Sequence, residues 1–292
     1  MYLVKMPRLR LTTLALATSL AAGSAACDSS QKGRDASAAT GQTSAEVSIR
    51  VDVPQGGAPS VSVLAFRATL TGAATADVLS VVDPLVGPPP SGVCERRDVA
   101  GAARTLGAQG ARVDLEALTD VSLDLGSAPV VRPGPRVYPA LAAVVSGVVA
   151  EAGPIDTAIL PEFLTANIGD GSTGIRERLP LPAMPRVTGT DPTQQGLTIT
   201  RGQALSLKIT GPAGTFVELR PFGAPWALVC PIGADGGLVL PAADLDRLQD
   251  RAGRVPVSVE AVWRESRSIG PLGQNTRLSL ELRSSQVVEF AP

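Results

Sequence analysis

Apolar and polar residues alternate along much of this chain after residue 45, and this two-residue period constrains the fold more than any other feature. Val47, Ile49 and Val51 are separated by Ser48 and Arg50. Because successive side chains of a strand point to opposite faces of a sheet, the pattern predicts half-buried strands, each with one apolar and one polar face. The same period returns at residues 60–65, 121–125, 197–200, 205–210, 257–261 and 278–283. We therefore expect a mainly β protein.

A proline-rich segment divides these strands into two groups. Residues 178–187 contain Pro180, Pro182 and Pro185, and proline keeps a connection extended because it restricts φ. The segment predicts a linker between a β-rich module at residues 46–183 and a second module at residues 184–292. The spacing of strands and turns is typical of antiparallel, Ig-like β-sandwiches.

Two segments deviate from the simple strand pattern. One short helix is expected in the second module, from Pro241 to about Asp250, because proline suits a first helical turn and Leu245 and Leu248 share a face. Residues 138–150 are apolar on both faces. A doubly buried strand is favoured there over a helix by the valine content, although periodicity does not separate the two.

The N-terminus has the pattern of an export signal. Lys5, Arg8 and Arg10 precede an apolar run at residues 11–22, which is too short to cross a bilayer but has the length of a signal-peptide core. Met6 is an alternative start, because the sequence from there is already a complete signal. We expect residues 1–26 to be a signal peptide.

The residues that follow resemble the lipobox of bacterial lipoproteins. The motif is "SAAC", in which Ser24 departs from the usual leucine and Cys27 is the cysteine. The resemblance implies cleavage after Ala26 and a diacylglyceryl group on Cys27. Residues 27–45 are rich in small polar residues and predict a flexible tether. The alternative is a soluble secreted protein, also cleaved after Ala26, with Cys27 as a free thiol.

Composition excludes several classes of chemistry. The chain has no histidine, which removes Ser-His-Asp and Cys-His catalysis and most histidine-based metal sites. Aromatic residues make up 3% of the chain, few for a sugar-binding groove. Lysine and arginine form no dense cluster, so we expect no nucleic-acid partner.

Cys94 and Cys230 are the two cysteines left beside Cys27. In an oxidising compartment a disulfide between them is the natural expectation, and two separate buried thiols are the alternative. A bridge over so long a loop would stabilise the chain by at most about 5 kcal/mol in the chain-entropy account.

Motifs that could carry chemistry are weak. Residues 169–174 match G-x-G-x-x-G but lack the following helix that a dinucleotide site needs, so they predict a glycine turn between strands. Asp170 and Asp235 lie in glycine-rich loops that could bind calcium weakly, but the full ligand series is missing. The S-x-x-K spacing of Ser29 and Lys32 lies in the tether.

Two further groups of residues are weaker candidates. The first group consists of carboxylates that we expect in solvent: Asp114, Glu116, Asp120, Asp124, Asp244 and Asp246. The second group consists of aromatic residues that we expect mainly in the core: Phe216, Phe222, Trp226 and Trp263.

Several segments together resemble the two-module, β-rich lipoproteins of myxobacteria. They are "LDLG" at residues 123–126, the strand that begins at Tyr138, "GDGSTG" at residues 169–174 and "LVCPIGADGGLVLPAADLDRL" at residues 228–248. The resemblance implies an architecture and a location, and no reaction or ligand.

Taken together, these patterns predict a lipid-anchored, non-catalytic protein of the cell envelope, facing the periplasm or the cell surface. It would act as a binding or scaffolding module for an unknown envelope protein or glycan, attach to the membrane through its lipid, and need no cofactor or metal. The alternatives are a carbohydrate-active or other hydrolytic enzyme that uses carboxylates, and a surface adhesion or structural module.

Overall fold

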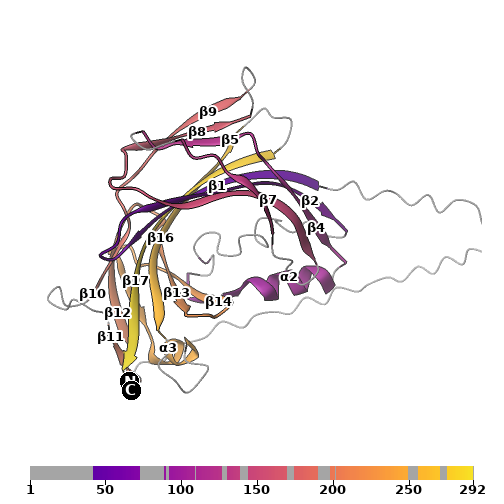
Figure 1. Ribbon diagram of the computed structural model, residues 1–292. Helices are drawn as coiled ribbons and strands as arrows, with labels where there is room; N and C mark the ends of the chain where they lie inside the picture. The colour runs from indigo at the N-terminus through magenta and orange to yellow at the C-terminus, as the bar shows by residue number, and fades with distance from the viewer. Residues whose placement is uncertain are drawn as a thin grey trace, which may run out of the picture. The chain divides into compact units, whose positions relative to one another are not determined.

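Strands dominate this computed structural model, which describes residues 42–72, 89, 92–108, 110–126, 130–138, 144–169, 174–189, 198–200, 202–248, 256–269 and 275–291 (Figure 1). Two helices lie among these residues, α2 (Val99–Ala108) and α3 (Ala242–Leu248). The strands are β1 (Gln42–Pro54), β2 (Ser60–Thr71), β3 (Glu95–Asp98), β4 (Arg112–Ala117), β5 (Val121–Asp124), β6 (Gly134–Val137), β7 (Val145–Asp156), β8 (Phe163–Ile168), β9 (Ile175–Pro180), β10 (Arg186–Gly189), β11 (Thr198–Thr200), β12 (Leu205–Thr210), β13 (Phe216–Pro221), β14 (Trp226–Pro231), β15 (Gly237–Leu240), β16 (Val257–Ile269) and β17 (Asn275–Ala291).

One large sheet connects the two ends of the described chain. Its strand order is β3-β14-β13-β16-β17-β1-β2-β4-β7-β6, and β11 pairs with the end of β17. At its centre β1 runs parallel to β17, with Val47 beside Leu278 and Val51 beside Leu282. Toward one edge β3, from the first half of the chain, pairs with β14, from the second half. Residues 38–292 therefore form one compact unit.

The mainly β prediction is confirmed, but the arrangement differs from the predicted modules 46–183 and 184–292. The boundary near residue 184 lies between β9 and β10, which belong to two small separate sheets, while the large sheet contains strands from both sides of it. Neither an Ig-like sandwich nor a division into two modules is confirmed. The reason is that alternation defines the two faces of a strand but not its neighbours.

The two small sheets, β5-β8-β9 and β10-β12-β15, pack against one face of the large sheet. Ile49 of β1 and Leu280 of β17 lie in one apolar core with Leu123 and Leu164 of the first small sheet. Farther along the same face, a second core is formed by residues of β13, β14, β16, the second small sheet and α3: Val217, Leu219, Leu228, Val257, Val259, Leu207, Leu240 and Leu245.

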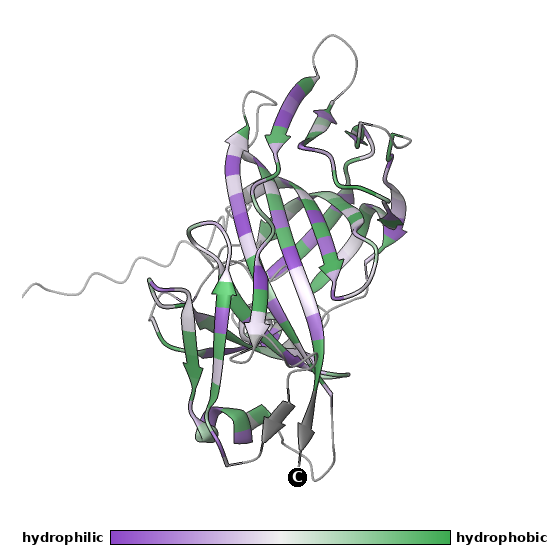
Figure 2. Ribbon diagram, turned by 90° about the vertical axis from the view of Figure 1, so that its left-hand side faces the viewer, coloured by the Kyte–Doolittle hydropathy of each residue, from purple (hydrophilic) through white to green (hydrophobic). Residues whose placement is uncertain are grey.

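The opposite face of the large sheet lies inside its curve, where Figure 1 shows α2. Phe66 of β2 packs there with Ala103 of α2, and Phe216 of β13 packs with Val262 of β16 in a separate apolar cluster. The strands between these clusters carry charged side chains, and Figure 2 shows hydrophilic and hydrophobic residues alternating along them.

Part of the polar face of β17 is buried, whereas the alternation predicts a half-buried strand. Its polar residues Ser279, Glu281 and Arg283 are 0%, 1% and 4% exposed. The prediction failed because the curved sheet has side chains packed on both faces, which alternation within one strand does not reveal.

The short helix expected from Pro241 is confirmed as α3, at Ala242–Leu248. In the segment 138–150, residues 145–150 begin β7, in agreement with the strand favoured there, whereas residues 139–143 lie outside the described residues.

Helix α2 was not predicted, because Gly101 and Gly107 disfavour helix. Gly107 packs closely against the segment before β7, since a Cβ atom there would lie 2.6 Å from a methyl group of Val144. Neither described helix has the length and apolar character needed to cross a membrane.

Candidate functional site

The central strands of the large sheet form a buried ion network around Arg283. Its Nη1 donates to Glu218 Oε2 at 2.9 Å and to Glu260 Oε2 at 2.5 Å, and its Nε donates to Glu281 Oε1 at 2.5 Å. These side chains come together because β13, β16 and β17 are neighbours in register: Glu218 is opposite Glu260, and Arg283 is opposite Val262. One arginine therefore links carboxylates from three strands.

The network continues across β17 to β1. Arg50 donates from Nε to Glu281 Oε1 at 2.8 Å, and Arg264 lies 3.7 Å from Glu281 and 3.6 Å from Glu46. The Ser279 hydroxyl donates to the Glu46 carboxylate. Opposite charges thus alternate across β16, β17 and β1 in the row Arg264, Glu281 and Arg50, an arrangement that strengthens the pairing and register of these three strands.

Burial and neighbouring charges separate the acidities of these carboxyl groups. Burial opposes ionisation of Glu281, but the charges of Arg283 and Arg50 outweigh it and lower its pKa to about 2. Burial raises the pKa of Glu218, even though Arg283 opposes that effect. For Glu260, Arg283 outweighs burial and lowers the pKa. Acid–base sites often place a carboxyl group with a raised pKa beside one with a lowered pKa, as Glu218 and Glu260 lie here.

Access argues against a catalytic role for this network. Glu218 is 0% exposed, so a substrate would reach it only after the packing on this face opened. Its Oε1 atom and Arg283 Nη2 are buried without a hydrogen-bond partner among the described residues. Ordered water is the usual partner for such atoms. The arrangement fits a structural ion network better than an active site.

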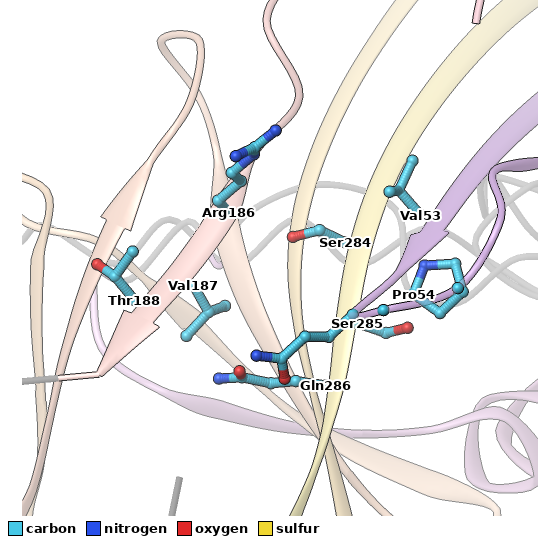
Figure 3. Close-up of a pocket in the computed structure, with 11 residues that line it drawn as sticks. Val53, Pro54, Arg186, Val187, Thr188, Ser284, Ser285 and Gln286 are labelled. Carbon is cyan, nitrogen blue, oxygen red and sulfur yellow. The ribbon is translucent and has the colours of Figure 1, made fainter. Parts of the chain in front are cut away.

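A cavity of about 420 Å³ lies on the other face of the large sheet, between β10 and the ends of β1 and β17. Figure 3 shows Arg186, Val187 and Thr188 of β10 on one side, and Ser284 and Gln286 of β17 on the other. Val53 and Pro54 complete an apolar wall. Its size is within the range of small-molecule sites.

The cavity has a structural origin in the strand pairing. Strand β1 ends its pairing with β17 at Pro54 and Ser285, and β11 begins its own pairing at Glu289. Residues 286–288 of β17 therefore have no strand neighbour on that edge among the described residues. The gap between β1 and β11 leaves the space that the cavity occupies.

A second cavity, of about 330 Å³, lies on the inner face next to β6 and β7. Its cations are Arg50 and Arg136, and both are neutralised by carboxylates: Arg50 by Glu281 and Arg136 by Glu151, each at 2.8 Å. The cavity between β10 and β17 is therefore the stronger candidate for binding an external ligand.

The predicted disulfide is confirmed. Cys94 is bonded to Cys230, and their Cα atoms are 4.1 Å apart. The bond links the residue before β3 to strand β14, which are neighbours in the large sheet. The predicted signal cleavage at Ala26 and lipidation of Cys27 lie outside the described residues, as do Ser29 and Lys32.

The carboxylates considered from the sequence do not converge. Asp114 and Glu116 point to solvent from β4, as expected, and Glu116 pairs with Arg67 at 2.8 Å. Asp124 and Asp235 accept hydrogen bonds from nearby main-chain N–H groups of Gly126 and Gly237. In the part of the chain that is described, no group of three or more metal-ligating side chains comes together.

The glycine motif lies between the antiparallel neighbours β8 and β9, but residues 170–173, Asp170 among them, lie outside the described residues. Two of the four aromatic residues are in the core as predicted: Phe216 is fully buried, and Trp263 is buried with its Nε1 donating to the Ala213 carbonyl at 3.1 Å. Phe222 is 60% exposed, and Trp226 is stacked under Arg96 at 4.0 Å.

Sequence reasoning missed the ion network and the cavity. Charges of opposite sign at alternate positions, such as Glu281 and Arg283, were a usable signal for the network. No family model, curated protein or solved structure matches this chain.

Proposed function

We propose that this chain is an exported, lipid-anchored and non-catalytic protein of the bacterial cell envelope that works by binding or scaffolding. The observation that carries the proposal is the disulfide between Cys94 and Cys230. Structural disulfides persist in oxidising compartments and are rare in the cytosol. A bond of this kind agrees with the export signal expected at residues 1–26 and with the lipobox cysteine, Cys27.

The non-catalytic part of the proposal is supported by the state of the ionisable groups. The chain contains no histidine, and the most perturbed carboxyl groups belong to a buried network whose members bind one another. Binding is instead supported by the cavity between β10 and β17, which opens beside an interruption in strand pairing.

The test is expression of the full chain in a bacterium that processes lipoproteins, followed by membrane fractionation and mass spectrometry. The protein is expected in the membrane fraction, starting at Cys27 and carrying a diacylglyceryl group. Cys27→Ala should lose the lipid and the membrane association. Cys94→Ala is the matched control, since it removes a different cysteine and should keep both.

Recovery of the unprocessed chain from the cytosol, with Met1 or Met6 still present, would contradict the proposal. A protein cleaved after Ala26 but without a lipid would support export and contradict anchoring. Hydrolysis of envelope glycans by the purified protein would favour the enzymatic alternative.

A further inference from the structure

The cavity between β10 and β17 has one cation, Arg186, among its described lining residues. Arg186 is exposed at its rim, and among the described residues it forms no ion pair. The described residues that line the cavity include no aspartate or glutamate. Asp52, next to Val53, belongs to the opposite face of the sheet, where it interacts electrostatically with Arg50, Arg283, Glu281 and Glu260. The cavity therefore favours a negatively charged ligand.

A second polar group at the cavity lacks a partner. The Nε2 atom of Gln286 is buried and has no hydrogen-bond partner among the described residues. An unpaired buried donor costs about 1–3 kcal/mol, and a ligand oxygen would remove that cost. Ser284, which lies across from β10 in Figure 3, supplies a hydroxyl to the same space. A ligand with a hydrogen-bond acceptor would therefore complement the amide of Gln286 and the hydroxyl of Ser284.

The remaining walls are apolar. Val53, Pro54 and Val187 line the cavity, so a ligand needs a hydrocarbon part as well as an anionic group. A phosphate dianion usually needs several cations or main-chain donors, whereas the planar fork of a single arginine matches one carboxylate.

We propose that this cavity binds a small monocarboxylate with an apolar body, with its carboxylate at Arg186 and Gln286 and its hydrocarbon against Val53, Pro54 and Val187. The inference rests on the binding role proposed above and gives it a place and a ligand class. It does not depend on export or on the lipid.

The test is isothermal titration of the purified protein with acetate, hexanoate and phenylacetate, and with the neutral amides hexanamide and phenylacetamide. Hexanoate and phenylacetate are expected to bind with a Kd of about 1 mM or lower, as ligands of this size allow. Acetate should bind more weakly because it lacks the apolar body, and each amide at least about fivefold more weakly than its acid because it lacks the charge.

Variants locate the site. Arg186→Gln should weaken binding of hexanoate about five- to tenfold, and Arg186→Lys should retain part of the affinity. Gln286→Leu, which keeps the side-chain size, should also weaken binding. The matched control is Arg112→Gln, which removes an exposed arginine from β4 far along the sheet order from this cavity and should have no effect.

The proposal is overturned if neither hexanoate nor phenylacetate binds, if the amides bind as tightly as the acids, or if Arg112→Gln weakens binding as much as Arg186→Gln. Such a failure would leave the membrane fractionation of the native protein unaffected. Conversely, loss of the anchor would leave this titration unaffected, so the two proposals fail separately.

Discussion

At the scale of the residue, Arg283 has the most consequential environment in the molecule. It is 4% exposed and binds carboxylates on three strands, two of which, Glu218 and Glu281, are themselves almost fully buried. Isolated buried charges are expensive, whereas paired ones are tolerated. Arg283 is therefore needed to balance the charge of these carboxylates, and its loss would leave them without a counter-charge.

Replacement of Arg283 with methionine should lower the free energy of unfolding by about 3–5 kcal/mol, because it leaves buried carboxylates unpaired. Urea denaturation followed by circular dichroism measures this. Arg136→Met is the matched control, since Arg136 forms an arginine–glutamate pair of 2.8 Å in an exposed position and should cost less than about 1 kcal/mol. Equal losses in the two variants would show that burial of the network contributes nothing.

The acidity of Glu281 predicts a pH dependence of stability. Its pKa is lowered from 4.5 to about 2, so its stabilising effect is complete above the unfolded-state pKa and is lost as pH falls toward 2. The difference in unfolding free energy between the wild type and Glu281→Gln should shrink by about 2 kcal/mol between pH 7 and pH 3. Urea titrations at the two pH values test this, and a difference that stays constant would contradict it. Glu218, whose pKa is raised, contributes in the opposite sense.

At the scale of the element, close approach of two backbones determines where β7 lies. Gly147 has a φ of 128°, and a Cβ atom there would lie 2.1 Å from the main-chain oxygen of Leu115 in the neighbouring strand β4. Only glycine avoids both the strained backbone and the clash. The parallel pairing of β4 with β7 thus depends on this residue.

Gly147→Ala should therefore destabilise the protein by about 3 kcal/mol or more, because backbone strain and overpacking add. Gly223→Ala is the control, since Gly223 also has a positive φ of 74° but a Cβ atom there would meet no other atom within 4 Å; it should cost about 1 kcal/mol. Thermal unfolding of both variants measures the difference, and similar losses would exclude crowding at Gly147 as the cause.

At the scale of the whole molecule, the large sheet makes the two halves of the chain interdependent. Strand β1 has β17 as its neighbour along eleven paired positions, from Ser44–Asn275 to Pro54–Ser285, and the disulfide joins the same two halves at β3 and β14. Separating the halves would expose unpaired strand edges on both.

Fragments 38–183 and 184–292 should therefore not fold alone, whereas the intact chain should unfold in a single cooperative transition. Circular dichroism and denaturant titration of each fragment, alone and mixed, test this expectation. Recovery of native-like signal only on mixing would support the shared sheet. Cooperative unfolding of either fragment alone would instead favour independent modules.

Local features were predictable where neighbours in sequence decide the outcome. The helix after Pro241 and the strand alternation from Val47 follow from capping and side-chain periodicity, which act within a few residues. The pairing of Cys94 with Cys230 followed from elimination, since they were the cysteines left for an oxidising compartment.

The placement of β1 beside β17, the burial of Glu281 and Arg283, and the cavity at Arg186 and Gln286 were decided only by the tertiary structure. Each depends on which strands become neighbours. That choice reflects the packing of side chains from distant segments on both faces of the sheet, whereas the sequence period around one strand carries information about that strand alone.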